Sequence, residues 1–223
     1  MVQENIVMNQ PDFSDFIVHF TKNAPPHSTE LHPVEVDALA HTTARERLDR
    51  ILRDGRILAT RMPYTNRRAA CFTECTWPSL LLHCQHYSPF GVGFRKSFVF
   101  QRGGGPAIYI RQDHYQSQVD KGGFADDVYP FLTPFAPGYA PPAYLQAWNR
   151  PPIDFTYQRE WRTPNDLQFT PQDVEFVLVD VLSDFGALSA AARAGLPESK
   201  WILLSNYKNI ETLWPQHNIG GPV

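Results

Sequence analysis

Residues 15–22 have the sequence DFIVHFTK, and this stretch decides which fold the chain can adopt. Phe16, Val18 and Phe20 alternate with Ile17 and His19, so both faces of an extended segment would be largely apolar. This pattern is typical of strands that are covered on both faces. The segment therefore predicts a central strand of a sheet.

A helix is expected after the proline-containing connector that follows this strand. Thr43 and Glu46 have the spacing of a capping box, and Gly55 is placed to end the helix. The apolar face of this helix would be formed by Ala44, Leu48, Ile51 and Leu52.

Other elements follow from the same patterns. Strands are expected at 69–74, 92–101, 106–111, 156–164, 174–182 and 201–205, and helices at 77–87, 184–195 and 209–214. The glycines at 103–105 are expected to form a hairpin turn, because they lack the Lys-Ser/Thr pair of a P-loop. The expected fold is one α+β domain over 1–223, with a bent mixed or antiparallel central sheet and flanking helices.

Two segments are expected to differ from this framework. Residues 1–14 are interpreted as a flexible N-terminus. Residues 112–153 are dense in proline, tyrosine and phenylalanine, and long irregular segments of this kind are functional loops or linkers. Since the aromatic content argues against disorder, the sequence predicts a packed lid at 112–153.

Composition excludes several classes of protein. The net charge is −3, so no general basic field attracts nucleic acid. A local basic patch is interpreted as a solvated helix face; its members are Arg45, Arg47, Arg50, Arg53, Arg56 and Arg61. No apolar run approaches the ~18–20 residues of a membrane helix. The N-terminal sequence lacks a secretory signal, so a cytoplasmic protein without membrane association is expected.

Three cysteines and two histidines raise a zinc hypothesis; they are Cys71, Cys75, His83, Cys84 and His86. Their spacing matches no familiar structural zinc motif, so no metal is expected. A catalytic Cys84–histidine pair is disfavoured because neighbouring helix residues point in different directions.

His19 and Thr21 form the first candidate site, on one face of the central strand. A histidine in an apolar strand must find hydrogen-bond partners, and backbone groups are the simplest ones. Together with Thr21, however, it has the groups to bind the polar edge of an amide or a ribose.

Glu160 is the second candidate. Strand alternation puts Glu160 and Arg162 on one face, with Arg159 and Trp161 on the other. A carboxylate beside an arginine can bind a ribose hydroxyl or stabilise a developing cation, and a structural ion pair is the equal alternative. Glu74, at the end of the 69–74 strand, is a further candidate carboxylate.

The order of short motifs resembles the AbiGi-type abortive-infection proteins of bacteria. The motifs are HFT (19–21), LxxILxxGRI (48–57), CFTE (71–74), YxPFGVGF (87–94), GGPAIY (104–109) and EWR (160–162). That family is associated with phage defence and is described as antitoxin-like. The resemblance, over roughly residues 16–180, implies a cognate toxin or antitoxin partner.

The layout of the site resembles ADP-ribosyltransferases, particularly the DarT-like and RNA 2′-phosphotransferase-like branches. The shared features are HxT on an early strand, a helix ending in glycine and a late-strand glutamate. This resemblance implies NAD as substrate and no metal. A clear tyrosine or serine of the middle motif is missing, and Glu160 stands between two arginines, which departs from the pattern.

The resemblance also implies roles for individual residues. His19 and Thr21 would hold the nicotinamide and its ribose, with Arg162 as a further binding residue. Glu160, as the catalytic carboxylate, would activate the acceptor or stabilise the oxocarbenium, with His19 beside it. The residues expected to stack on the ring are Phe72, Phe90 and Tyr157.

The sequence therefore predicts an ADP-ribosyltransferase-like enzyme that transfers ADP-ribose from NAD to a protein or nucleic acid in phage defence. The alternative is a non-catalytic antitoxin or sensor that binds a partner protein or nucleotide. The enzyme requires His19, Thr21 and Glu160 to line one cleft, with the strands of His19 and Glu160 adjacent or two apart. The side chains of His19 and Glu160 are expected on the same face of the sheet. A metal-dependent nuclease would need clustered ligands that this order does not supply.

Overall fold

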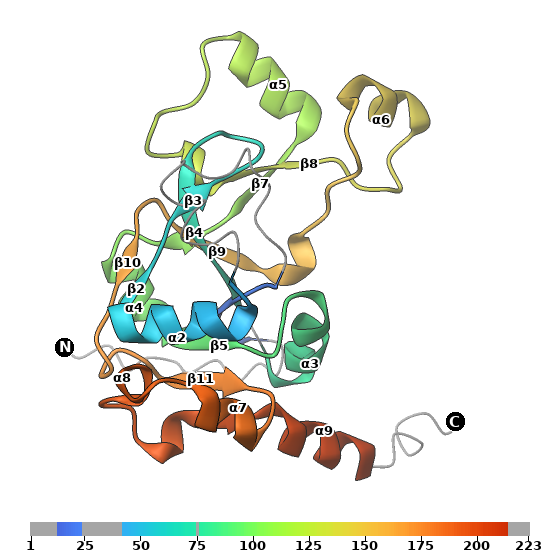
Figure 1. Ribbon diagram of the computed structural model, residues 1–223. Coiled ribbons are helices and arrows are strands. Elements are labelled where there is room, and N and C mark those ends of the chain that lie inside the picture. The colour runs from blue at the N-terminus through green and yellow to red at the C-terminus, as the bar shows by residue number, and fades with distance from the viewer. Residues whose placement is uncertain (1–12, 24–41, 75, 214–223) are drawn as a thin grey trace, which may run out of the picture.

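The computed structural model describes residues 13–23, 42–74 and 76–213 (Figure 1). Most of the expected N-terminal segment 1–14, and Cys75, lie outside these residues. Phe13 and Ser14 are described, and the backbone N–H of Ser14 donates a hydrogen bond to Glu74 Oε1 over 3.1 Å. Residue 214, the expected end of the last helix, also lies outside them.

One curled sheet organises the described chain. Its order is β12-β11-β5-β1-β4-β9-β6, and β3 pairs with one end of β4. The strands are β1 (Phe16–Phe20), β3 (Thr60–Arg61), β4 (Arg68–Glu74), β5 (Gly91–Arg95), β6 (Gly105–Pro106), β9 (Glu160–Thr163), β11 (Phe176–Val179) and β12 (Trp201–Leu203). The pairings are antiparallel except for β11 with β12. The predicted strand 15–22 is confirmed as a central strand.

Two short ladders and a set of helices complete the fold. The ladders pair β2 (Arg56–Ile57) with β10 (Leu167–Gln168) and β7 (Ile108–Arg111) with β8 (Leu132–Phe135). The helices are α2 (Ala44–Asp54), α3 (Trp77–His86), α4 (Lys96–Gln101), α5 (Gln112–Asp120), α6 (Pro142–Trp148), α7 (Leu182–Ala187), α8 (Ala190–Arg193) and α9 (Leu204–Leu213). Short 3-10 turns lie at η1 (Tyr129–Phe131), η2 (Thr156–Gln158) and η3 (Glu198–Lys200). The mixed α+β architecture with flanking helices is as predicted.

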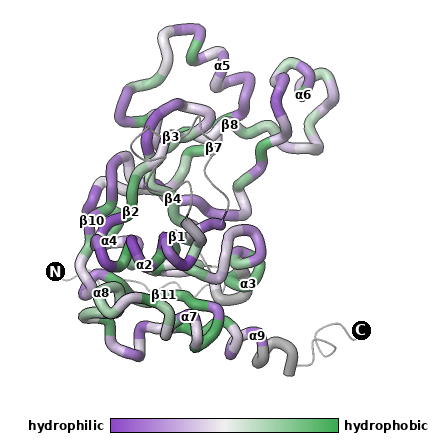
Figure 2. Tube along the Cα trace, in the orientation of Figure 1, coloured by the Kyte–Doolittle hydropathy of each residue, from purple (hydrophilic) through white to green (hydrophobic). Residues whose placement is uncertain are grey.

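Hydrophobic residues cover the sheet on both faces. On one face Ile17 and Phe94 pack in a cluster with Leu48 of α2. On the other face Val18 packs with Leu80 of α3. Figure 2 shows hydrophobic residues along β4 and β11, whereas hydrophilic residues predominate along α2. No helix of the described chain is long and apolar enough to cross a membrane.

The predicted strand 92–101 is wrong in its second half. β5 ends at Arg95 and α4 begins at Lys96, so the glycines at 103–105 end a helix and form no hairpin turn. Gly103 has φ +81°, and Gly104 N–H donates to Val99 O over 2.9 Å, as in a Schellman motif. The alternation fails because the neighbours Phe98 and Val99 both pack against the core, whereas Phe100 is exposed, and adjacent residues of a strand would face opposite sides.

Other elements also differ from the sequence prediction. The strand expected at 106–111 is divided between β6 of the large sheet and β7 of a separate ladder, and the helix expected at 209–214 already begins at Leu204. The helix expected at 184–195 is divided into α7 and α8, because Ser189 begins a new helix by accepting a hydrogen bond from Ala192 N–H. The strand expected at 156–164 begins only at Glu160, after η2.

Residues 112–153 contain regular elements and extend from one end of the molecule, where Figure 1 shows α5 and α6. The segment is anchored at β8, which pairs in parallel with β7. Its expected role as a lid stays a prediction.

The end of α2 allows a test of the fold. Gly55 has φ +58°, and an added Cβ would meet Phe169 O at 2.7 Å. Gly55→Ala should therefore lower the free energy of unfolding by roughly 2–4 kcal/mol, since it adds a backbone clash to left-handed strain. Chemical denaturation measures this loss.

Gly103→Ala is the matched control. Its φ is also positive, but no described heavy atom lies within 4 Å of the added Cβ. A loss of only about 1 kcal/mol is expected there. Equal losses at both positions would contradict the assigned contact with Phe169.

Candidate functional site

The site is a cleft that opens where two central strands separate. β1 and β4 pair at Ile17↔Glu74 and Val18↔Thr73, whereas β1 pairs with β5 at five positions. Beyond Val18 a cleft of about 670 Å³ lies between the strands. This volume is in the range of small-molecule and cofactor sites.

The cleft has two walls of different chemistry. One wall is formed by α2, β2 and β3, and it includes Arg47, Arg50 and Arg61. The other wall is formed by the end of α3, by η2 and by β9, and it includes Tyr87 and Glu160. A ligand in the cleft would therefore meet cations on one side and aromatic and carboxylate groups on the other.

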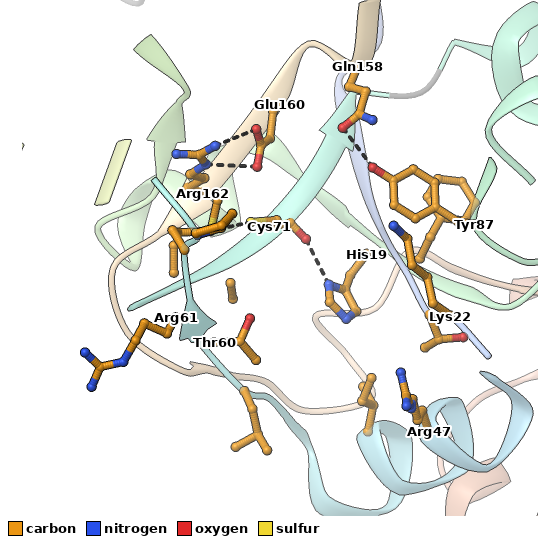
Figure 3. Close-up of a pocket in the computed structure, with 18 of the residues that line it drawn as sticks. His19, Lys22, Arg47, Thr60, Arg61, Cys71, Tyr87, Gln158, Glu160 and Arg162 are labelled. Atoms are coloured by element: carbon orange, nitrogen blue, oxygen red, sulfur yellow. Dashed lines mark hydrogen bonds and ion pairs between the residues drawn. The ribbon is translucent and has the colours of Figure 1, made fainter. Parts of the chain in front are cut away.

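His19 lies between the two walls, and its imidazole replaces part of the missing strand ladder (Figure 3). Its Nδ1 is 2.8 Å from the backbone oxygen of Cys71 on β4. Because a carbonyl can only accept, Nδ1 bears the hydrogen, and Nε2 is the acceptor in the neutral ring. Burial lowers the pKa of His19, although the hydrogen bond to Cys71 opposes this effect. His19 thus offers the cleft an acceptor nitrogen at neutral pH.

Glu160 is held by Arg162 in a buried ion pair. Arg162 Nε donates to Oε1 over 2.9 Å, and Nη2 donates to Oε2 over 2.7 Å. The other donors of Arg162 are bound to the backbone oxygens of Pro130 and Leu132 and to Thr133 Oγ1. All five guanidinium N–H groups are therefore used, and the arginine is only 1% exposed. Arg162 fixes the carboxylate and has no donor left for a ligand.

The strands of His19 and Glu160 are two apart, as predicted, because both β1 and β9 neighbour β4. Strand alternation puts His19 on the face of Ile17 and Phe72, and its ring lies 5.9 Å from that of Phe72. Glu160 pairs in register with Thr73, on the opposite face, so the prediction that the two side chains share one face of the sheet is wrong. Both residues still line one cleft, because the cleft passes between the separated strands.

Thr21 lines the cleft, but its hydroxyl is already bound. It is buried and donates to Ala44 O over 2.8 Å, with Phe90 O at 3.2 Å. The role of Thr21 is thus to fix the start of α2 against β1. Its predicted contact with a ligand would have to break these hydrogen bonds.

The three predicted ring-stacking residues have different positions. Tyr157 lines the cleft and is 49% exposed. Phe72 and Phe90 are not among the described residues that line it, and both pack in the core beneath the sheet. Stacking by Phe72 or Phe90 on a ligand therefore does not fit the structure.

A chain of aromatic and amide groups borders the cleft, and most of it was missed in the sequence. Tyr87 stacks on Phe20 at 5.7 Å, and its hydroxyl donates to Gln158 Oε1 over 2.8 Å. Gln158 Nε2 donates in turn to the Tyr157 hydroxyl over 3.1 Å, and Tyr157 stacks on His83. The end of α3 is thus tied to the turn that leads into β9.

The cleft is positively charged although the whole chain has a net charge of −3. Of the described lining residues, six are cationic and two are carboxylates; they are Lys22, Arg47, Arg50, Arg56, Arg61 and Arg162 against Asp54 and Glu160. Four of the six arginines of the basic patch, which was expected to be a solvated helix face, belong to this set. The basic patch in the sequence could have indicated the cationic wall of the cleft. The spacing of the arginines along the chain, however, does not show that they face a cleft.

The zinc hypothesis finds no support within the described residues. There, no group of three His, Cys, Asp or Glu side chains could hold a metal ion. Burial raises the pKa of the Cys71 thiol and raises that of Cys84 to about 12, so neither is a reactive thiolate near pH 7.

The buried ion pair gives a stability prediction. Arg162→Met should lower the free energy of unfolding by about 3–5 kcal/mol, because it leaves Glu160 buried without its cation. Adding Glu160→Met should recover part of this loss, since no buried charge then remains. Urea denaturation of the single and the double variant measures both changes in the free energy of unfolding. If Arg162→Met alone were as stable as the double variant, the prediction that an unpaired Glu160 destabilises the fold would be wrong.

The histidines give a pH prediction. Burial lowers the pKa of both His19 and His83 below 6.5, and His86 contributes at His83. Below pH 6.5 the unfolded chain binds protons that the folded chain does not, so stability should fall as pH falls. His19→Gln should make this fall shallower in denaturation curves measured from pH 7 to 5. An unchanged slope would contradict a neutral, buried His19.

No family model, curated protein or solved structure matches the chain.

Proposed function

We propose that the cleft binds NAD and that the protein is an ADP-ribosyltransferase-like enzyme. One observation carries the proposal: His19 and Glu160 line one positively charged cleft of about 670 Å³. The phage-defence setting and a cognate toxin or antitoxin rest on the resemblance to AbiGi-type proteins.

The two walls suit the parts of a dinucleotide. The pyrophosphate is anionic, and arginines such as Arg47 and Arg50 line one side. An aromatic ring can stack beside the half-exposed Tyr157 on the other side. A ribose hydroxyl would donate to His19 Nε2, which is the acceptor in the neutral ring.

The proposed reaction breaks the bond between the ribose C1′ and the nicotinamide nitrogen. The bonding electrons leave with nicotinamide, and the ribose becomes a cation-like oxocarbenium. The carboxylate of Glu160, held in one orientation by Arg162, would face this developing charge. An acceptor nucleophile, from a protein or a nucleic acid, then bonds to C1′ and loses its proton.

A second candidate is a nucleotide-binding antitoxin or sensor without catalysis. The observation that favours it is the guanidinium of Arg162, which binds both carboxylate oxygens of Glu160 and counters their charge. In this case the cleft would recognise a nucleotide through the same cations, and Glu160 would have a structural role only.

Glu160→Gln separates the two functions. If Glu160 stabilises the transition state, the rate of NAD cleavage should fall about 10²–10³-fold, or roughly 3–4 kcal/mol, whereas NAD affinity should change far less. Turnover and thermal stability are measured on one preparation. A destabilised variant that keeps its activity per folded molecule would remove Glu160 from the catalytic residues.

Glu175→Gln is the matched control. Glu175 also pairs with an arginine, Arg95, at 2.7 Å, but it does not line the cleft. Its substitution should leave NAD cleavage unchanged. A similar loss at both positions would point to a general effect of breaking ion pairs.

A further inference from the structure

Residues 112–153, which were expected to form a lid, contribute no residue to the lining of the cleft in the described chain. Their first part, 112–135, contains α5, η1 and β8, and we call it the arm. Figure 1 shows α5 at one end of the molecule, beyond β3. The arm nevertheless contacts both walls of the cleft from outside.

The first contact is with the hairpin that joins β3 to β4, residues 62–67. Met62 and Tyr64 of this hairpin line the cleft. The hydroxyl of Tyr115, on α5, donates to the backbone oxygen of Tyr64 over 3.3 Å. Tyr115 is buried, so water competes less for this hydrogen bond.

Arg67, at the other end of the hairpin, has two further contacts with the arm. Its guanidinium pairs with Asp126 and lies 5.2 Å from the centre of the Tyr129 ring. The backbone oxygen of Arg67 accepts from Met62 N–H over 2.7 Å, and Met62 Sδ lies 3.6 Å from the thiol of Cys71. A chain of contacts therefore leads from the arm through Arg67 to Met62 and Cys71, which both line the cleft.

The second contact of the arm is with Arg162, on the wall of Glu160. Arg162 donates to the backbone oxygens of Pro130 and Leu132, which belong to the arm. Arg162 also pairs in register with Cys71. The two chains of contacts from the arm therefore end at neighbouring positions of β4 and β9.

An aromatic cluster inside the arm joins its contacts with the hairpin. The ring of Phe124 lies 5.7 Å from the ring of Tyr115 and 5.7 Å from the ring of Tyr129. The backbone N–H of Phe124 also donates to the Tyr129 hydroxyl over 3.2 Å. Because close-packed side chains transmit strain, the arm holds the hairpin as one unit.

We propose that the arm sets the spacing of the two cleft walls, and that Arg67 is the positioning residue through which it holds the hairpin. Without the Arg67 side chain, the hairpin keeps the pairing of β3 with β4 and the hydrogen bond from Tyr115. Its loss therefore loosens one wall and leaves the other, which Arg162 holds, in place. The role of the arm goes beyond the proposed function, and only its effect on NAD rests on that function.

Arg67→Gln tests the role of the arm through the thiol of Cys71, without any ligand. Alkylation of the full chain by iodoacetamide, followed by peptide mapping, should be about three- to tenfold faster at Cys71, because Met62 is held less firmly against it. Cys84, on α3, is the internal reference, and its rate should be unchanged. Global unfolding would accelerate both cysteines, whereas loosening of the hairpin accelerates Cys71 alone.

The kinetics of NAD cleavage give the second readout. In Arg67→Gln the KM for NAD should rise by a similar factor, because the hairpin belongs to the wall that would bind the ligand. The kcat should stay within about twofold, because Arg162 still holds Glu160. Arg67→Lys keeps the positive charge near Asp126 and the Tyr129 ring, so it should restore most of the KM and most of the slow alkylation.

Arg111→Gln is the matched control. Arg111 also pairs with a carboxylate, Asp113, and lies 5.7 Å from a tyrosine ring, that of Tyr144. Neither partner belongs to the hairpin. Its substitution should leave both the alkylation of Cys71 and the KM for NAD unchanged.

The outcomes separate this inference from the proposed function. If Arg67→Gln alkylates no faster at Cys71 than Arg111→Gln, or if Cys84 accelerates equally, the role of the arm is wrong whether or not NAD is cleaved. If Cys71 accelerates alone but the unmodified chain neither binds nor cleaves NAD, the role of the arm stands and the proposed function fails. If Cys71 accelerates alone and the KM for NAD is unchanged, the arm does not position the binding wall and the inference is overturned.

Discussion

The guanidinium of Arg162 joins two parts of the molecule that are distant in sequence. It belongs to β9, it binds the carboxylate that faces the cleft, and it satisfies the backbone oxygens of Pro130 and Leu132. A buried arginine is costly to desolvate unless its donors are all used, and here all five are used. The position of Glu160 therefore depends on the position of the segment around Pro130 and Leu132. The candidate site thus depends on residues that do not line it.

The cleft itself exists because β1 and β4 pair over only part of their length. A sheet that stayed paired along these strands would leave no room between them. The backbone oxygen of Cys71, which a longer ladder would have bound, accepts a hydrogen from the side chain of His19 instead. This satisfies a buried carbonyl and sets the tautomer of the ring at the same time. One hydrogen bond therefore satisfies the carbonyl that the separated strands leave unpaired and sets the chemistry of His19.

Features set by near neighbours in sequence could be predicted, and those set by distant contacts could not. The capping box of Thr43 and Glu46 and the left-handed Gly55 are local, and both are observed. The convergence of His19 and Glu160 on one cleft was also anticipated. The helical turn after Arg95 was missed, because the run of aromatic residues fits a strand as well as a helix. The core position of Phe72 was missed for another reason, since it depends on which face of β4 packs against Phe94.

Charge in this cleft is distributed so that recognition and chemistry occupy different environments. The arginines of the rim are solvated, so their attraction for phosphate is weak per contact and sensitive to salt. Glu160 lies deeper and is only 8% exposed, so its field is less screened by water and ions. Because Arg162 counters that field, the carboxylate can act on a cation only at short range, where the nearer charge dominates. A ligand would therefore have to be positioned closely by the rim before Glu160 could influence it, and the rim charges and the buried pair need each other for any reaction in this cleft.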